Sequence, residues 1–465
     1  MKEKMFFRLV LVAGAATMLA ACTSESENGP SANISYESIA ATQQVPVTFG
    51  TYIGEQANTR YGSGGSITSN TLLQGKGFGV FAYYTQNVGY SSSATPNFMY
   101  DQAVTYSTKW EYTPIKYWPN DYNATGAVDQ QTSPATGTVS DRLSFFAYAP
   151  YEATANDGTP SGTSTKESST EVGITAFTGN STTGDPKVTY VARINNTIAN
   201  AVDLLWGVAA TGGLSYTAAN GSAQNVAAGM PLIDLVKPTT GTSINFAFNH
   251  ALAGLNLTAA AKFNNGSYAD IPDETFIHID EVVITANLNN TGVLNLNNTA
   301  PNIPLWDVTA ATPRATTFTL SNSDISSYLR YSDVGSTVAN IKNGVGREST
   351  TAAAKTTTPQ QVINGNVNEG SVTKTNIFTM LPKSTSTTFT VTVTYYVRTK
   401  DPALFNGYSS VKNKITKDVT FSTGLSGSLI YTINMILGLE DVSMTGTVEP
   451  WTDGSTENVL LPENS

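Results

Sequence analysis

The 465-residue chain is poor in cysteine, histidine and charge. One Cys and two His exclude a disulfide framework and any Cys/His zinc site made by this chain alone. Charged residues make up only 13% and the formal net charge is −10, so there is no basic stripe to neutralise phosphates. We therefore expect no metal, no cofactor and no nucleic-acid partner.

Thr, Ser, Gly and Asn are abundant instead, together with 22 Tyr. This composition is typical of strands joined by polar turns and predicts an all-β fold. The sequence contains no fixed-period repeat, no amphipathic helix of convincing length and no catalytic constellation among its 35 acidic residues. We therefore expect a protein that is not an enzyme.

The amino terminus is typical of an exported protein. Basic residues at positions 2, 4 and 8 precede an apolar run over residues 9–20, which is too short to span a bilayer but suits a signal peptide. Leu19-Ala20-Ala21-Cys22 resembles the lipobox of bacterial lipoproteins. An ordinary signal peptide that contains a Cys is the alternative. We expect residues 1–21 to be the signal peptide, Cys22 to be lipidated, residues 22–44 to be a tether, and the protein to reach the outer membrane.

The first strand of the exported chain is predicted over residues 45–53. Val45, Val47, Phe49 and Ile53 fall on one side of a two-residue repeat. Pro46 cannot donate a ladder hydrogen bond, so this strand should be an edge or a first strand. The loop that follows, residues 56–65, places a lone Arg60 before a glycine-rich tip, where proteases commonly cut. We call residues 45–53 the leader strand and expect residues 45–60 to be removable.

Further apolar runs predict core strands in two successive halves of the chain. The turn residues around 238–241 place the domain boundary, giving domains over residues 45–240 and 241–465. His250 could be a proton shuttle or a hydrogen-bonded structural residue, and we favour the structural role because no Ser or Cys partner is near in sequence. Core strands are expected over residues 77–84, 143–148, 202–208, 244–257, 276–288, 389–397, 429–437 and 442–451.

Aromatic residues are dense between positions 110 and 119. Trp110, Tyr112, Tyr117 and Trp118 are candidates for a platform on which sugar rings stack. The alternative is that they pack the end of a sandwich and its turn, and we favour this second interpretation.

The order of these motifs resembles the fimbrillin family, the lipoprotein pilins of Bacteroidales-type (type V) pili and their fimbrillin-like relatives. Each motif alone is weak, but their order and spacing span nearly the whole chain. The residues that carry the resemblance are Cys22 with its lipobox and residues 47–60, 78–83, 110–119, 145–150, 203–205, 248–252 and 448–451.

The resemblance implies two tandem transthyretin-like β-sandwich domains. It also implies cleavage by an arginine-specific protease between Arg60 and Tyr61; Arg314 and Arg347 do not follow a first strand. Loss of the leader strand would open a groove that a carboxy-terminal segment of the next subunit fills, by strand addition. The corresponding donor lies in residues 442–461, and its candidate residues are Val442, Met444, Val448, Trp451, Val459 and Leu461.

We therefore expect a structural pilin at the cell surface, exported as a lipoprotein and polymerised with other pilin subunits into adhesive pili. Its partners would be copies of itself, tip or anchor subunits, the protease, the outer membrane through the lipid on Cys22, and host or bacterial surface ligands. Two alternatives stay open: a surface lipoprotein that binds glycans or host ligands through the aromatic residues, and an unprocessed anchor or cap. Of a shaft or tip role, the shaft role is preferred, because both an Arg loop and a carboxy-terminal strand are present.

Overall fold

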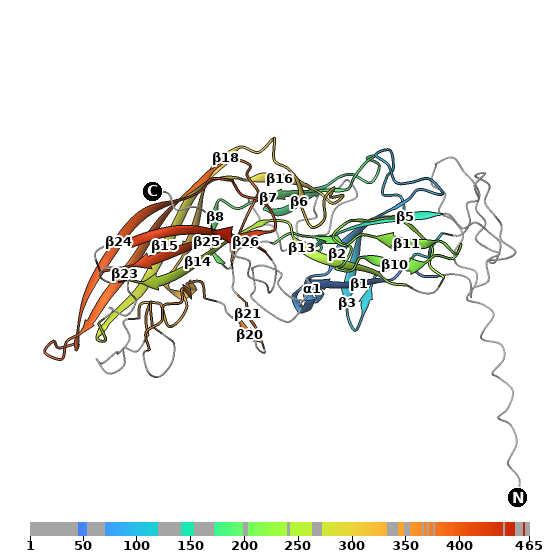
Figure 1. Ribbon diagram of the computed structural model, residues 1–465. Coiled ribbons are helices and arrows are strands. Elements are labelled where there is room, and N and C mark those ends of the chain that lie inside the picture. The colour runs from blue at the N-terminus through green and yellow to red at the C-terminus, as the bar shows by residue number, and fades with distance from the viewer. Residues whose placement is uncertain are drawn as a thin grey trace, which may run out of the picture. The chain divides into compact units, whose positions relative to one another are not determined.

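The computed structural model describes most of the chain after the tether, and all of these residues belong to one compact unit. The ranges that it describes are residues 45–53, 70–119, 141–152, 172–198, 203–239, 242–262, 272–332, 343–347, 354–364, 367–369, 372–374, 377–439, 442–451 and 459–460. Nearly all regular structure is β (Figure 1), so the predicted all-β class is confirmed. The short helix α1, Asn70–Lys76, precedes the first core strand. The transthyretin-like detail stays a prediction.

The first sheet has eight strands in the order β1-β13-β9-β5-β2-β3-β4, and β12 also pairs with β5. Its strands are β1 (Phe49–Ile53), β2 (Phe78–Tyr84), β3 (Met99–Tyr106), β4 (Trp110–Glu111), β5 (Arg142–Ala149), β9 (Leu205–Val208), β12 (Leu232–Val236) and β13 (Ile244–His250). A separate hairpin joins β10 (Leu214–Thr217) to β11 (Ala223–Val226).

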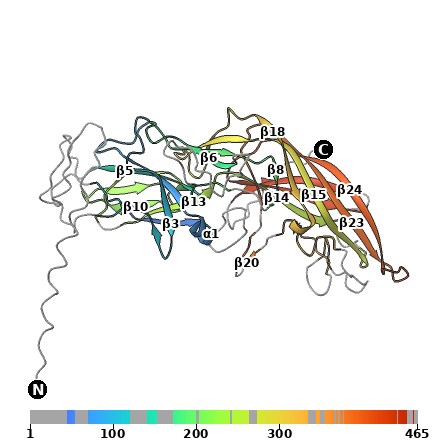
Figure 2. The same ribbon diagram turned by 180° about the vertical axis from the view of Figure 1, so that it is seen from behind.

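A six-stranded and a five-stranded sheet follow, and a hydrophobic core holds residues of both. The six-stranded sheet contains β14 (Ala253–Ala261), β19 (Gln360–Gln361), β22 (Phe378–Met380), β25 (Leu429–Leu437), β26 (Val442–Pro450) and β27 (Val459–Leu460). The five-stranded sheet contains β8 (Asn195–Asn196), β15 (Thr275–Asn289), β18 (Pro313–Leu320), β23 (Thr387–Lys400) and β24 (Tyr408–Phe421). Figure 2 shows β15, β23 and β24 as long adjacent ribbons.

The remaining strands form two small sheets. Four strands in the order β17-β16-β7-β6 lie over residues Leu305–Asp307, Thr291–Asn295, Lys187–Val191 and Gly173–Phe177. A two-stranded sheet joins β20 (Val367–Glu369) to β21 (Val372–Lys374). A 3-10 helix, Asn322–Asp324, follows β18.

The central strands of the first sheet are buried on both faces. In β2, Phe78 and Val80 face one apolar cluster, whereas Phe81 and Tyr83 face another. A strand buried on both faces needs no polar side, which explains why this part of the sequence is a continuous apolar run.

Sheet pairing does not change at the predicted domain boundary between residues 240 and 241. β13 lies after the boundary but pairs with β9 and β1, whereas β8 lies before it but pairs with β18. The four-stranded sheet combines β6 and β7 with β16 and β17. Residue 240 therefore does not separate the sheets, because strands from before and after it pair within the same sheet. The division into two domains stays a prediction.

Candidate functional site

The leader strand lies at one end of the first sheet, as far as the described residues show. Its β1 part pairs in parallel with β13 through five residue pairs, from Phe49 opposite Ile244 to Ile53 opposite Phe248. The preceding residues use another partner: the backbone N–H of Val47 donates to Lys116 O at 2.9 Å, and that of Trp118 donates to Val45 O at 2.9 Å. The predicted edge position of the strand is therefore confirmed.

Two side chains of the leader strand fill the core beneath it. Val47 is 1% exposed and Phe49 is 6% exposed. Four rings surround Phe49, with centroids between 5.4 and 6.2 Å away; they belong to Phe78, Tyr112, Phe145 and Phe246. The strand thus supplies core side chains although it is held at the edge of a sheet.

Tyr112 fastens the leader strand through its hydroxyl group. The phenol O–H donates to the carbonyl of Val47 at 2.8 Å and accepts the backbone N–H of Lys116 at 3.2 Å. Burial raises the pKa of Tyr112 to about 12, so the phenol keeps its proton at neutral pH and remains a donor. Its ring also packs on Phe49.

The other aromatic residues of this segment do not share one exposed face. Trp118 is 2% exposed and packs edge-on against Phe145 at 5.8 Å, whereas Tyr117 is 44% exposed. Trp110 is half-buried and packs edge-on against Phe78 at 4.9 Å. A sugar cannot stack on Trp118 while it is buried, so the geometry favours the packing interpretation of this segment.

Four of the carboxy-terminal donor candidates lie in two strands, Val442, Met444 and Val448 in β26 and Val459 in β27, and Trp451 directly follows β26. β26 pairs with β25 through nine residue pairs, and β27 pairs with β26 through two. Val442, Val448 and Trp451 are buried, and Met444 is partly buried against the core shared by the six- and five-stranded sheets. β27 includes Val459 and is the last strand in the order of its sheet.

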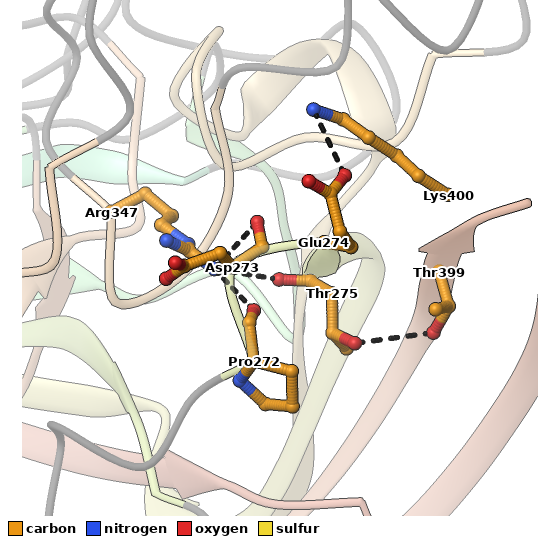
Figure 3. Close-up of polar contacts among 7 residues, drawn as sticks. All are labelled: Pro272, Asp273, Glu274, Thr275, Arg347, Thr399 and Lys400. Carbon is orange, nitrogen blue, oxygen red and sulfur yellow. Dashed lines mark hydrogen bonds and ion pairs between the residues drawn. The ribbon is translucent and has the colours of Figure 1, made fainter.

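Of the alternative loop arginines, Arg347 is enclosed by its own chain. Its guanidinium group donates to the carbonyls of Pro272 at 2.6 Å, Asp273 at 3.3 Å and Thr275 at 3.1 Å (Figure 3). The side chain is 2% exposed, and burial lowers its pKa from the usual value. Arg314 is exposed but lies in β18, where it pairs with Leu288 of β15. A protease that needs an extended, accessible arginine would meet an obstacle at both.

The two histidines are buried structural residues. Nδ1 of His250 lies 2.9 Å from the carboxylate of Asp203. Burial, aided by the nearby charge of Arg398, lowers the pKa of His278 to about 4. The described part of the chain holds no group of three or more His, Cys, Asp or Glu that could bind a metal.

Several predicted positions lie outside the described residues. They are Cys22 and the signal peptide, Arg60 and Tyr61, and Leu461. Within the ranges that are described, no helix is long and apolar enough to cross a membrane.

Sequence reasoning missed three features of this site. The parallel pairing of β1 with β13 joins segments almost two hundred residues apart, and no local pattern indicates it. No local pattern indicates the role of the Tyr112 hydroxyl group either. The stacking of Trp451 on His250, at 3.9 Å between ring centroids, links two motifs that lie far apart in the sequence.

Comparison with known proteins gives a consistent result. No family model matches the chain. Fimbrium subunit Fim1C of Phocaeicola vulgatus is 25% identical over 428 residues, which cover 89% of this chain and 90% of that protein. The crystal structure of a fimbrial protein from Bacteroides vulgatus matches with a TM-score of 0.54 at 18% identity, covering 88% of this chain and 100% of that one. The chain is thus a homologue of a fimbrium subunit along nearly its whole length, and the resemblance to the fimbrillin family is confirmed.

Proposed function

We propose that this protein is a structural pilin that polymerises by exchanging its leader strand for a strand of a neighbouring subunit. Homology to a fimbrium subunit supports a pilin role, a location in a cell-surface fimbrium and contact with other pilin subunits. It also favours a role without enzymatic activity. The observation that carries the exchange mechanism is the leader strand itself, an edge strand whose Val47 and Phe49 are core residues.

An edge strand that supplies buried side chains is suited to exchange for another strand. Losing it would uncover the apolar pocket around Phe49 and the free edge of β13. An incoming strand would restore both, with ladder hydrogen bonds for affinity and side-chain pockets for register. While the leader is covalently attached, its high effective concentration excludes a competitor. Cleavage at Arg60–Tyr61 is therefore the proposed commitment step, and head-to-tail donation that does not close makes a filament.

The proposal includes export as a lipoprotein through Cys22, attachment to the outer membrane and cleavage by an arginine-specific protease. The donor lies within residues 442–461 of another subunit. A shaft or tip subunit is the preferred role over an unprocessed anchor or cap. Glycan binding through Trp110, Tyr112, Tyr117 and Trp118 is less well supported, because Trp118 is buried and Tyr112 holds the leader strand.

The test compares the unaltered protein with Arg60→Lys, which keeps the charge but removes the arginine that the protease recognises. Both are treated with an arginine-specific endoprotease, and their products are examined by mass spectrometry and electron microscopy. We expect a new amino terminus at Tyr61 and fibres from the unaltered protein alone. Fibres from uncut Arg60→Lys, or complete cleavage at Tyr61 without any polymer, would contradict the proposal.

A further inference from the structure

The leader strand joins the two ends of the first sheet. In the sheet order its β1 part lies at one end and β4 lies at the other. The chain that follows β4 returns to the leader, where Pro46 and Tyr117 form an antiparallel bridge. We call residues 112–118, which make this return, the clasp.

Opposite edges of the leader bond to the clasp and to β13. The backbone N–H of Trp118 donates to Val45 O at 2.9 Å, and that of Val47 donates to the carbonyl of Lys116 at the same distance. The carbonyl of Thr48 instead accepts a backbone N–H of β13 at 2.8 Å. Successive residues of an extended strand direct their backbone hydrogen-bonding groups to opposite edges. The leader therefore lies between β13 and the clasp.

The leader is held more firmly up to Phe49 than after it. The side chains of Val47 and Phe49 are buried, and the Tyr112 hydroxyl donates to Val47 O at 2.8 Å. Within the described ranges, hydrogen bonds from the clasp reach the leader only at Val45 and Val47. Farther along, the hydroxyl oxygen of Thr51 is buried without a hydrogen-bond partner among the described residues, which is unfavourable. The leader should therefore open more readily at its carboxy-terminal end.

We infer that the clasp sets the order of strand exchange. The leader opens first at Ile53, towards the end that cleavage frees, and it is released last at Val45 and Val47. An incoming strand pairs with β13 while the leader is still bound to the clasp. Tyr112 is a positioning residue in this step, because its hydroxyl binds a main-chain carbonyl, a group that every strand offers. The inference rests on the proposed function and adds the path by which one strand replaces the other.

This order protects the apolar pocket that the leader fills. The pocket is lined by aromatic rings, including those of Phe78 and Phe246 around Phe49. If the leader left before another strand arrived, this apolar surface would face water and could bind other proteins non-specifically. A clasp that keeps the cleaved leader in place until a second strand has begun to pair avoids that state.

The order of opening can be tested before any polymer forms. Amide hydrogen exchange is measured by NMR in the uncut protein and in the protein cut after Arg60. Two amides report on the two ends of the leader: Trp118, which donates to Val45 O, and Phe248 of β13, which lies opposite Ile53. We expect cleavage to speed exchange at Phe248 at least tenfold and at Trp118 less than twofold. An acceleration at Trp118 that equals or exceeds that at Phe248, or none at either, would overturn the inferred order.

The role of Tyr112 is tested by the release of a fluorescently labelled leader from the cleaved protein. Tyr112→Phe removes the hydroxyl group and keeps the ring that packs on Phe49. Tyr117→Phe is the matched control, since Tyr117 belongs to the same segment but is exposed. We expect Tyr112→Phe to release the leader about three to ten times faster, because one hydrogen bond is lost, and the control to stay within twofold of the unaltered protein. Equal rates in the two variants would overturn the role of Tyr112.

An excess of unlabelled synthetic peptide with the sequence of residues 45–53 supplies the incoming strand in the same assay. We expect release from the unaltered cleaved protein to speed up with peptide concentration, because the peptide pairs with β13 before the leader leaves the clasp. Release at a rate independent of peptide concentration would overturn the inferred path. A cleaved protein that keeps its labelled leader at every peptide concentration would refute strand exchange itself, and the inference would fall with it.

Discussion

At the scale of single residues, Tyr117 lies at the surface and Trp118 lies in the core. They are neighbours in the chain, yet Tyr117 is 44% exposed and Trp118 is 2% exposed. Trp118→Ala should lower the free energy of unfolding by about 3–5 kcal/mol, because it leaves a cavity beside Phe145. Tyr117→Ala should change it by only about 0.5 kcal/mol. Urea denaturation measures both, and equal losses would show that the packing has been misunderstood.

His278 gives stability a dependence on pH. Its pKa is about 4 in the folded chain because the imidazole is buried near Arg398, and about 6.5 when unfolded. Below the unfolded pKa the unfolded chain binds a proton that the folded chain does not. Stability is therefore complete above pH about 6.5 and falls by up to about 1.4 kcal/mol per pH unit until pH about 4.

The matched variant for this prediction is His278→Gln, which cannot titrate. Its free energy of unfolding is compared with that of the unaltered protein by urea denaturation at pH about 7 and about 4.5. The unaltered protein should lose more stability than the variant. Parallel losses would assign the acid sensitivity to other groups.

At the scale of elements, the affinity of the protein for its leader strand should depend on the buried side chains of that strand. In the cleaved protein, a leader with Phe49→Ala should bind about ten to a hundred times more weakly, because burial of this ring contributes about 1.5–3 kcal/mol. Thr48→Ala is the control, since the Thr48 side chain is exposed and its hydroxyl group hydrogen-bonds with that of Ser243 at the surface. Dissociation of a fluorescently labelled leader fragment measures both. A Phe49→Ala leader that leaves no faster than the control would rule out the Phe49 pocket as the main anchor.

Strands could be predicted from the sequence where a local pattern of residues indicates them. Pro46 and the alternation of Val45, Val47 and Phe49 indicated an edge strand. Apolar runs likewise indicated β2 and β5, because strands buried on both faces carry few polar residues. Partners could not be predicted in this way: nothing local in β13 shows that it pairs with β1 and β9 although it lies after residue 240.

At the scale of the whole molecule, the sheets combine strands from both halves of the sequence. β8 contributes to the five-stranded sheet, and the four-stranded sheet takes two strands from each side of residue 240. The stacking of Trp451 on His250 also connects the end of β26, in the six-stranded sheet, with β13 of the first sheet. Loop composition around residues 238–241 could not reveal this arrangement, because a turn-rich stretch marks a break in strand structure and not a change of sheet.

The central claim is that the leader strand leaves and a strand of another subunit replaces it. Native mass spectrometry of the protein cut after Arg60 tests this most directly, before and after polymers form. The account predicts one leader fragment bound to each cleaved monomer before assembly, and none in the polymers except at a terminal subunit. Polymers that retain one leader fragment for every subunit would contradict it.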